Sequence, residues 1–425
     1  MGFLVNIIVS ILILHLNILG EKYMKNKNYY CMLLSIIINN FGDVLFDLFI
    51  IWSITRKTDN ILNAVYLIGS SILFRAILSL FVGILIDHKN KKNLIIFTNI
   101  SSALIVFLFF INFEFIIDRI WLSLLLILLN NINNEIFSKS YLILGSELFD
   151  KEKFIKFQST YTIAVRIINV FGSAIVGFLI AYLSEKFIFG LDILTFFISA
   201  VLIIKVKYTY IAKESNLKGI IQILEEIKFD VKYTFKSIYK ISFLKKFVML
   251  MFILNIAYGF IPYILPLIIS NNNNSSILLG GLKSAITIGE ILGLFLVVKL
   301  GRYVSILFKV SMVGCAIIMF SLINISNMNI IIIIFLLYGA LDSITQPLFS
   351  YTVSSIDEES RGRILGGIDT LILISPSLGM WIGTKLMNIN YNVGLLFLSS
   401  IFIIALILIL TSKDFNGIRI SSENK

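Results

Sequence analysis

The chain has 425 residues, of which 58% are hydrophobic and only 14% are charged. Soluble domains usually carry about 25% charged residues, so this composition excludes an ordinary soluble domain. The apolar residues form runs of about 20, the length that a helix needs to cross a bilayer. A membrane β-barrel would instead show alternating segments of about 10 residues, which this sequence lacks. We therefore predict an all-α integral membrane protein.

The net charge of +11 would also suit a nucleic-acid-binding protein, but its distribution favours a membrane protein. The lysines lie in the loops between apolar runs, as they do in the cytoplasmic loops of membrane proteins. The sequence contains no soluble basic domain that would bind nucleic acid. The two cysteines lie in or beside apolar runs and the two histidines are far apart, so we expect no metal site and no cofactor.

Twelve apolar runs predict twelve transmembrane helices in two groups of six. The first group comprises residues 31–54, 61–86, 94–113, 120–142, 158–184 and 187–206. The second comprises residues 247–270, 277–300, 304–324, 329–351, 364–388 and 391–412. The chain therefore divides into an N-terminal segment (1–30), two six-helix bundles (31–206 and 247–412), a linker (207–246) and a tail (413–425).

The linker is rich in lysine and carries apolar residues at helical spacing around Ile220, Leu224 and Ile227. This pattern predicts one or two amphipathic helices on the inner membrane surface. Placing the Lys25 side in the cytoplasm puts most loop lysines and arginines on the inner side. We therefore expect a multi-pass plasma-membrane protein whose twelve-span core has both ends in the cytoplasm.

Residues 2–19 are also apolar and admit two interpretations. They form an extra first span or a signal-like segment, or translation starts at Met24. A thirteenth span would put one terminus outside, although both ends of the twelve-span core are positively charged. We favour the start at Met24.

The two groups of spans resemble a repeat. An offset of 207 residues lays the acidic loop that contains Asp150 on the loop that contains Asp357, and it places Glu135 on Asp342. Parallel repeats of six spans occur in transporters built from two related halves. The offset supports that plan.

The loop between the second and third runs reads GILIDHKNKKN, starting at Gly83. It resembles the signature loop of the major facilitator superfamily, and Gly83, Asp87, Lys91 and Lys92 match that pattern. Asn90 replaces the usual glycine, and asparagine also tolerates the left-handed backbone. The resemblance implies that Asp87 contacts neighbouring spans and stabilises the outward-facing state.

Three further segments resemble the macrolide-efflux branch of this superfamily, in which proton-driven export of drugs is typical. They are NNFGDVLFDLFIIWSI in span 1, FGLDILTFFISAVLI in span 6 and DEESRGRILGG before span 11. The resemblance implies two six-helix pseudo-repeats, alternating access, and a central cavity lined by spans 1, 4, 7 and 10. Span 4 lacks the arginine of many proton antiporters, which leaves the coupling mechanism open.

Ionisable residues inside the spans are costly and mark ion or substrate pathways. Asp43 and Asp47 lie one turn apart in span 1. Asp43 and Arg75 both lie about 18 Å from the inner ends of their helices, which predicts a buried pair. Glu135 and Arg166 lie at a common depth of about 14 Å, which predicts a second pair. The alternative for each of these charges is a purely structural salt bridge.

In the second half, Glu290 and Asp342 fall near mid-depth without an arginine close in sequence. Lys283 and Asp192 lie nearer to span ends, where a lysine can extend to the surface. We predict that Asp342, together with Glu290, is the proton site, because an acid without a cation partner can take up a proton. Asp43 is the rival candidate.

Span 7 supplies four residues for a substrate cavity, Asn255, Tyr258, Phe260 and Tyr263, although aromatic side chains also serve as packing residues. We expect a secondary transporter, not an enzyme, because no Walker A pattern and no catalytic motif is present. The expected partners are a small-molecule substrate and membrane lipid, with no ATP and no nucleic acid, and the protein is expected to be a monomer driven by the proton gradient. The alternatives are an exporter of a peptide or siderophore, a sodium-coupled carrier, a receptor, flippase or scaffold on the same fold, or a channel.

Overall fold

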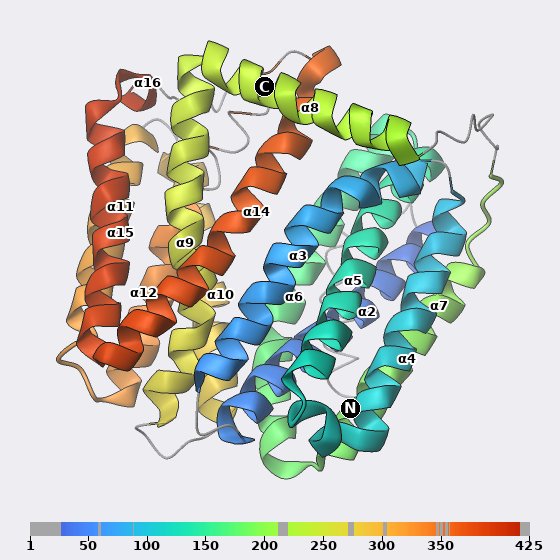
Figure 1. Cartoon of the computed structure of the whole chain (residues 1–425), viewed down its shortest axis with the longest axis horizontal. Helices are drawn as coiled ribbons and strands as arrows, with labels where there is room; N and C mark the ends of the chain where they lie inside the picture. The colour runs from blue at the N-terminus through green and yellow to red at the C-terminus, as the bar shows by residue number, and fades with distance from the viewer. Residues whose placement is uncertain are drawn as a thin grey trace.

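A computed structural model describes residues 27–57, 61–87, 89–210, 220–270, 276–300, 304–345, 348, 352, 356 and 358–416. Every regular element in these residues is a helix, and the long helices run roughly side by side (Figure 1). The apolar stretch 2–19 and Met24 lie outside the described residues. The all-α prediction is confirmed for the part of the chain that the structure describes.

The first six long helices match the first six predicted spans. They are α2 (Lys27–Lys57), α3 (Ile61–Asp87), α4 (Lys91–Ile117), α5 (Ile120–Leu148), α6 (Lys151–Tyr182) and α7 (Glu185–Ile204). We refer to this group as the N-half.

The second group, the C-half, also contains six helices. They are α9 (Ser242–Ser270), α10 (Ser276–Leu300), α11 (Val304–Ser321), α12 (Met328–Asp342), α14 (Glu358–Ile389) and α15 (Tyr391–Thr411). The shorter helix α16 (Lys413–Asn416) follows them. The α12 helix ends nine residues before the predicted end of its span, and a 3₁₀ turn, η3 (Ser343–Thr345), follows it directly.

Length and composition make eight of the described helices long and apolar enough to cross a membrane. Large apolar side chains such as Phe97, Phe295 and Ile317 are more than half exposed on the outside of the bundle. Exposed apolar surface on this scale is characteristic of a protein that faces lipid. Polar side chains cap the N-terminal ends of several helices. The hydroxyl of Ser184 and the amide oxygen of Asn327 accept hydrogen bonds from backbone N–H groups of the first turn.

The linker contains one helix, α8 (Ile220–Lys240), which crosses one end of the molecule and contacts α3, α9 and α14 (Figure 1). One face of α8 is apolar and the other is charged, as the sequence pattern predicts. We call this end of the molecule the α8 side. Its place on a membrane surface stays a prediction.

The two halves meet along two antiparallel helix pairs, α6 with α10 and α3 with α14. Close approach of α6 and α10 depends on glycine, because the Cα of Gly280 would lie only 3.0 Å from a Cβ added at Gly177. The Ser276 hydroxyl donates to the Gly177 carbonyl at 2.9 Å, and the Ser284 hydroxyl donates to the Val170 carbonyl. These contacts run from the middle of α6 toward its end opposite the α8 side.

We predict that Gly280→Ala destabilises the contact between the halves, because its new Cβ would lie 2.3 Å from the Ser173 carbonyl oxygen. Overpacking of this kind costs about 1–3 kcal/mol. The neighbouring Gly281→Ala is the matched control, because nothing lies within 4 Å of its added Cβ. Thermal unfolding of the purified protein in detergent should show a lower midpoint for Gly280→Ala only. Equal midpoints for the two variants would contradict the tight α6–α10 packing.

Candidate functional site

Two adjoining cavities lie between the N-half and the C-half. Their volumes are about 320 Å³ and about 370 Å³, and Asp47, Tyr258, Pro262 and Lys283 line both of them. Cavities of this size are at the small end of the range for ligand pockets. The shared residues come from α2, α9 and α10, so both halves build the site.

The first cavity carries charges from three helices. Asp47 comes from α2, Arg75 from α3 and Lys283 from α10. The positive charges of Lys283 and Arg75 both act on the Asp47 carboxylate. The rest of the wall is mainly apolar and includes Ile50, Ile51, Ile68, Ile72, Ile127 and Met380.

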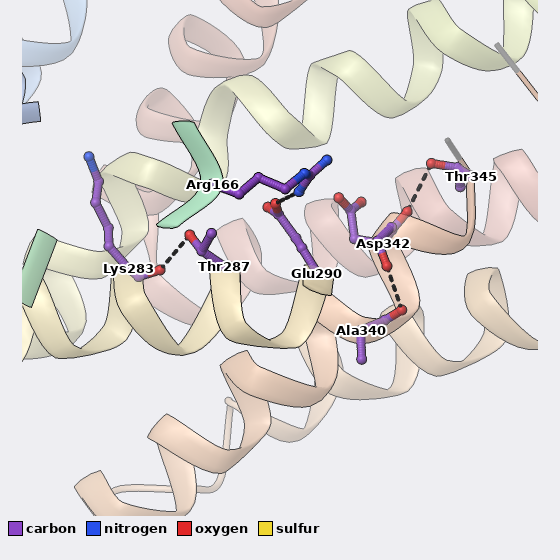
Figure 2. A network of polar contacts seen from close by, with 8 residues as sticks. Arg166, Lys283, Thr287, Glu290, Ala340, Asp342 and Thr345 are labelled. Atoms are coloured by element: carbon purple, nitrogen blue, oxygen red, sulfur yellow. Dashed lines mark hydrogen bonds and ion pairs between the residues drawn. The ribbon is translucent and has the colours of Figure 1, made fainter. Parts of the chain in front are cut away.

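The second cavity contains an ion pair that joins the two halves. The Arg166 Nη1 of α6 lies 2.9 Å from the Glu290 Oε2 of α10, and each side chain is about three-quarters buried. Asp342 of α12 lines the same cavity, and Figure 2 shows its carboxylate beside Glu290. With Asp47 and Lys283, the second cavity is therefore lined by three carboxylates and one ammonium group, and the Arg166 guanidinium contacts one of the carboxylates.

Asp342 occupies the point at which α12 stops being an α-helix. The hydroxyl of Thr345 in the following 3₁₀ turn donates to the Asp342 carbonyl at 2.9 Å (Figure 2). The Ser311 hydroxyl of α11 donates to the Leu341 carbonyl at 2.6 Å. Helix breaks of this kind in transporters expose backbone groups at ion and substrate sites. The break is not visible in the sequence, which shows a continuous apolar run.

Neither predicted ion pair is correct. Arg166 pairs with Glu290 rather than with Glu135, and Glu135 pairs instead with Lys139 one turn along α5, at 2.9 Å. The Asp43 carboxylate accepts a hydrogen bond from the Asn134 amide at 3.2 Å. Matching depth failed as a criterion because it fixes the height of a residue in the bundle but not the direction in which its side chain points.

Two charged residues that the sequence placed near span ends have inner positions. Lys283 lines both cavities and does not extend to the surface. Asp192 is fully buried, and its carboxylate oxygen would lie 2.7 Å from a Cβ added at Gly42. Lys283 is thus a site residue that the sequence analysis missed, although its position within an apolar run was a usable signal.

Two of the four span 7 predictions fit the cavity. Tyr258 and Tyr263 line the first cavity, and Tyr258 also lines the second. Phe260 lines neither, because it is fully buried against Gly383 of α14. The Asn255 amide donates to the Met251 carbonyl of its own helix at 2.8 Å and lines neither cavity.

The signature loop lies on the α8 side, away from the cavities. Gly83 and Asp87 belong to α3, and their side chains lie outside the described part of the structure. Asn90 has φ −67°, so the expected left-handed backbone is absent, and its side chain instead caps α4 by accepting from the Asn93 N–H. Lys92 donates to the carbonyls of Ile204 and Val206, both at 2.8 Å, while Lys91 is buried beside the ring of Tyr210.

We predict that Arg166 and Glu290 depend on each other. Arg166→Gln or Glu290→Gln alone should reduce the yield of folded protein, because the remaining charge loses this ion-pair contact. The cost should be below the roughly 3–5 kcal/mol of a fully buried pair, since both side chains are partly exposed. The double variant should recover yield and thermal midpoint.

Glu135→Gln is the control for this experiment, because its partner Lys139 is 40% exposed and lies on the same helix. Lys139 also donates to the Ser79 carbonyl at 3.3 Å, so it keeps a partner in this variant. Simple addition of the two single losses in the Arg166–Glu290 double variant would show that the pair does not form.

Comparison with known proteins agrees with this architecture. The family model described as Major Facilitator Superfamily matches residues 26–371. No curated protein matches the chain. Three solved structures illustrate the likeness in fold. A D-xylose–proton symporter has a TM-score of 0.70 at 13% identity, covering 93% of this chain and 99% of that one.

A bacterial homologue of the human lysosomal transporter Spinster, in an inward-facing and unoccupied conformation, has a TM-score of 0.67 at 13% identity, with coverage of 95% and 100%. A human organic anion transporter has a TM-score of 0.64 at 12% identity, with coverage of 90% and 99%. At these identities the likeness concerns the fold alone. The family match covers most of the sequence, and family and fold indicate a membrane transporter rather than an enzyme. The chain therefore belongs to the Major Facilitator Superfamily.

Proposed function

We propose that this transporter exports a small amphipathic compound across the plasma membrane in exchange for protons. The observation that carries the proposal is a cavity between the two halves that combines an apolar wall with ionisable residues. Ionisable groups at this depth are costly and occur where a transporter handles ions or substrate. The macrolide-efflux resemblance of spans 1 and 6 supports the direction of transport.

Alternating access requires a contact between the halves that can open and close. On the side opposite α8, Gly69 of α3 packs against Trp381 of α14, and Gly177 packs against Gly280. These contacts support a state in which the cavities are closed on that side. The ion pair between Arg166 and Glu290 bridges the same two halves and must rearrange when they rock.

Asp342 is the residue that we propose to carry the proton. It lines the second cavity, and its interaction with the Glu290 carboxylate is repulsive. Glu290 already has a cation partner in Arg166, which makes it the weaker of the two candidates. Like charges at close range favour the uptake of one proton. Asp43 stays the alternative, because it also lies deep in the bundle and has an amide rather than a cation as its hydrogen-bond partner.

We predict that the α8 side faces the cytoplasm. A cysteine at the exposed position Lys89, on the α8 side, should resist a membrane-impermeant thiol reagent in intact cells. A cysteine at the exposed Lys186, on the opposite side, should react. Both should react after the cells are opened. The reverse pattern in intact cells would invert the proposed orientation.

We predict that Asp342→Asn separates coupling from binding. In inverted vesicles with an imposed proton gradient, the variant should no longer concentrate substrate, because it has lost the ionisable group. Downhill exchange of substrate should continue, because an asparagine side chain has nearly the same volume as the aspartate that it replaces. A parallel experiment with a sodium gradient tests the other ion. Gradient-driven accumulation by the variant would remove Asp342 from the mechanism, and Asp43→Asn would then be tested in the same way.

A further inference from the structure

We propose that the transported compound carries an anionic group, held between Arg75 and Lys283, and an apolar body that contacts the isoleucine-rich wall of the first cavity. This inference rests on the proposed function, because it treats the cavity as the transport site. The proposed function names only an amphipathic compound, and this inference adds the sign of its charge.

The first observation is the charge of the lining. Among the described residues that line the first cavity, Arg75 and Lys283 are cations and Asp47 is the acid. The two positive charges act on the one carboxylate, which leaves an excess of positive charge in a space enclosed by helices. Of the two further acids in the second cavity, Glu290 is paired with Arg166, and Asp342 is the proposed proton carrier, which adds no negative charge while it is protonated. Low-dielectric surroundings strengthen the attraction of such a site for an anion.

The second observation concerns hydrogen-bond donors. The Arg75 Nε is buried and has no hydrogen-bond partner in the part of the chain that the structure describes. Arg75 lines the first cavity. An arginine binds a carboxylate with two parallel N–H donors, and a free Nε is the donor needed for one common form of that contact. A buried donor without a partner is costly, so a ligand oxygen that accepts from it stabilises the complex.

The third observation concerns the apolar body of the ligand. Six of the lining residues, Ile50, Ile51, Ile68, Ile72, Ile127 and Met380, are apolar and come from α2, α3, α5 and α14. They offer a surface for a hydrocarbon or aromatic body beside the charged end. A cationic amphiphile would fit the same wall but would meet Arg75 and Lys283 with the wrong sign of charge.

The Asp47 carboxylate leads to the most specific expectation for anion binding. This carboxylate is the counter-charge for both cations. A ligand anion must compete with it for them. Removing the negative charge at position 47 should therefore strengthen anion binding, whereas removing either positive charge should weaken it. Packing alone would not produce opposite signs from neighbouring residues.

The test uses the full-length protein in lipid nanodiscs, with empty nanodiscs as the reference for partition into lipid. Three fluorescent probes share one dansyl-labelled eleven-carbon chain and end in a carboxylic acid, its methyl ester or a primary amine. The acid should bind at least about tenfold more tightly than the ester or the amine. Arg75→Gln and Lys283→Gln should each remove this preference, and Asp47→Asn should increase the affinity for the acid.

Two further variants keep the result interpretable. Lys283→Arg retains the charge and should retain the preference for the acid. Lys385→Gln removes a cation of α14 that lines neither cavity, and it should leave all three affinities unchanged. Wild-type protein that does not prefer the acid, or that binds none of the probes, overturns the inference. So does an equal loss of acid and ester binding in the Arg75 and Lys283 variants.

The outcome is separable from that of the proposed function. Preference for the acid without gradient-driven transport in inverted vesicles would retain the anion site and reject proton-coupled export. Gradient-driven export of compounds by a protein that shows no preference for the acid would retain the transporter and reject the anion site.

Discussion

The structure depends on the pairing of opposite charges across the boundary between the two halves. The Arg166–Glu290 pair crosses this boundary with a contact of 2.9 Å. Since a lone charge in this position would be costly, the N-half supplies the cation of the pair and the C-half supplies the anion. The two halves are therefore held together by an ion pair as well as by packing. The other charged residues of the cavity lining lie around this pair.

Glycine complements this pairing at the closed side. Between α6 and α10 the backbones come close enough for a Cβ at Gly280 to collide with a carbonyl oxygen. Small residues allow such approach in membranes, where apolar side chains gain little by leaving lipid. The same pair of helices thus carries a close-packed stretch toward one end and an ion pair near the middle. Both contacts border the second cavity, because Ser173 of the packed stretch and Glu290 of the ion pair line it.

The sequence predicted the fold well and the site in part. Runs of apolar residues are a property of each helix alone, so twelve spans and an amphipathic linker helix could be predicted from the sequence. The partners of buried charges depend on helix rotation, which composition does not encode. For this reason the predicted pairing of Arg166 with Glu135 and the predicted position of Lys283 near the surface are wrong. The end of α12 at Asp342 depends on packing by α10 and α11, so the apolar run 329–351 gave no sign of it.

Lys92 has a mechanical consequence for the N-half. Its amine binds the two carbonyls at the end of α7, where the negative end of the helix dipole favours a cation. The first turn of α4, which follows the loop after α3, is thereby bound to the last helix of its own half, and the neighbouring Lys91 lies over the Tyr210 ring beyond that helix. Because α4 begins at Lys91, we expect the start of α4 and the end of α7 to move together when this loop is displaced.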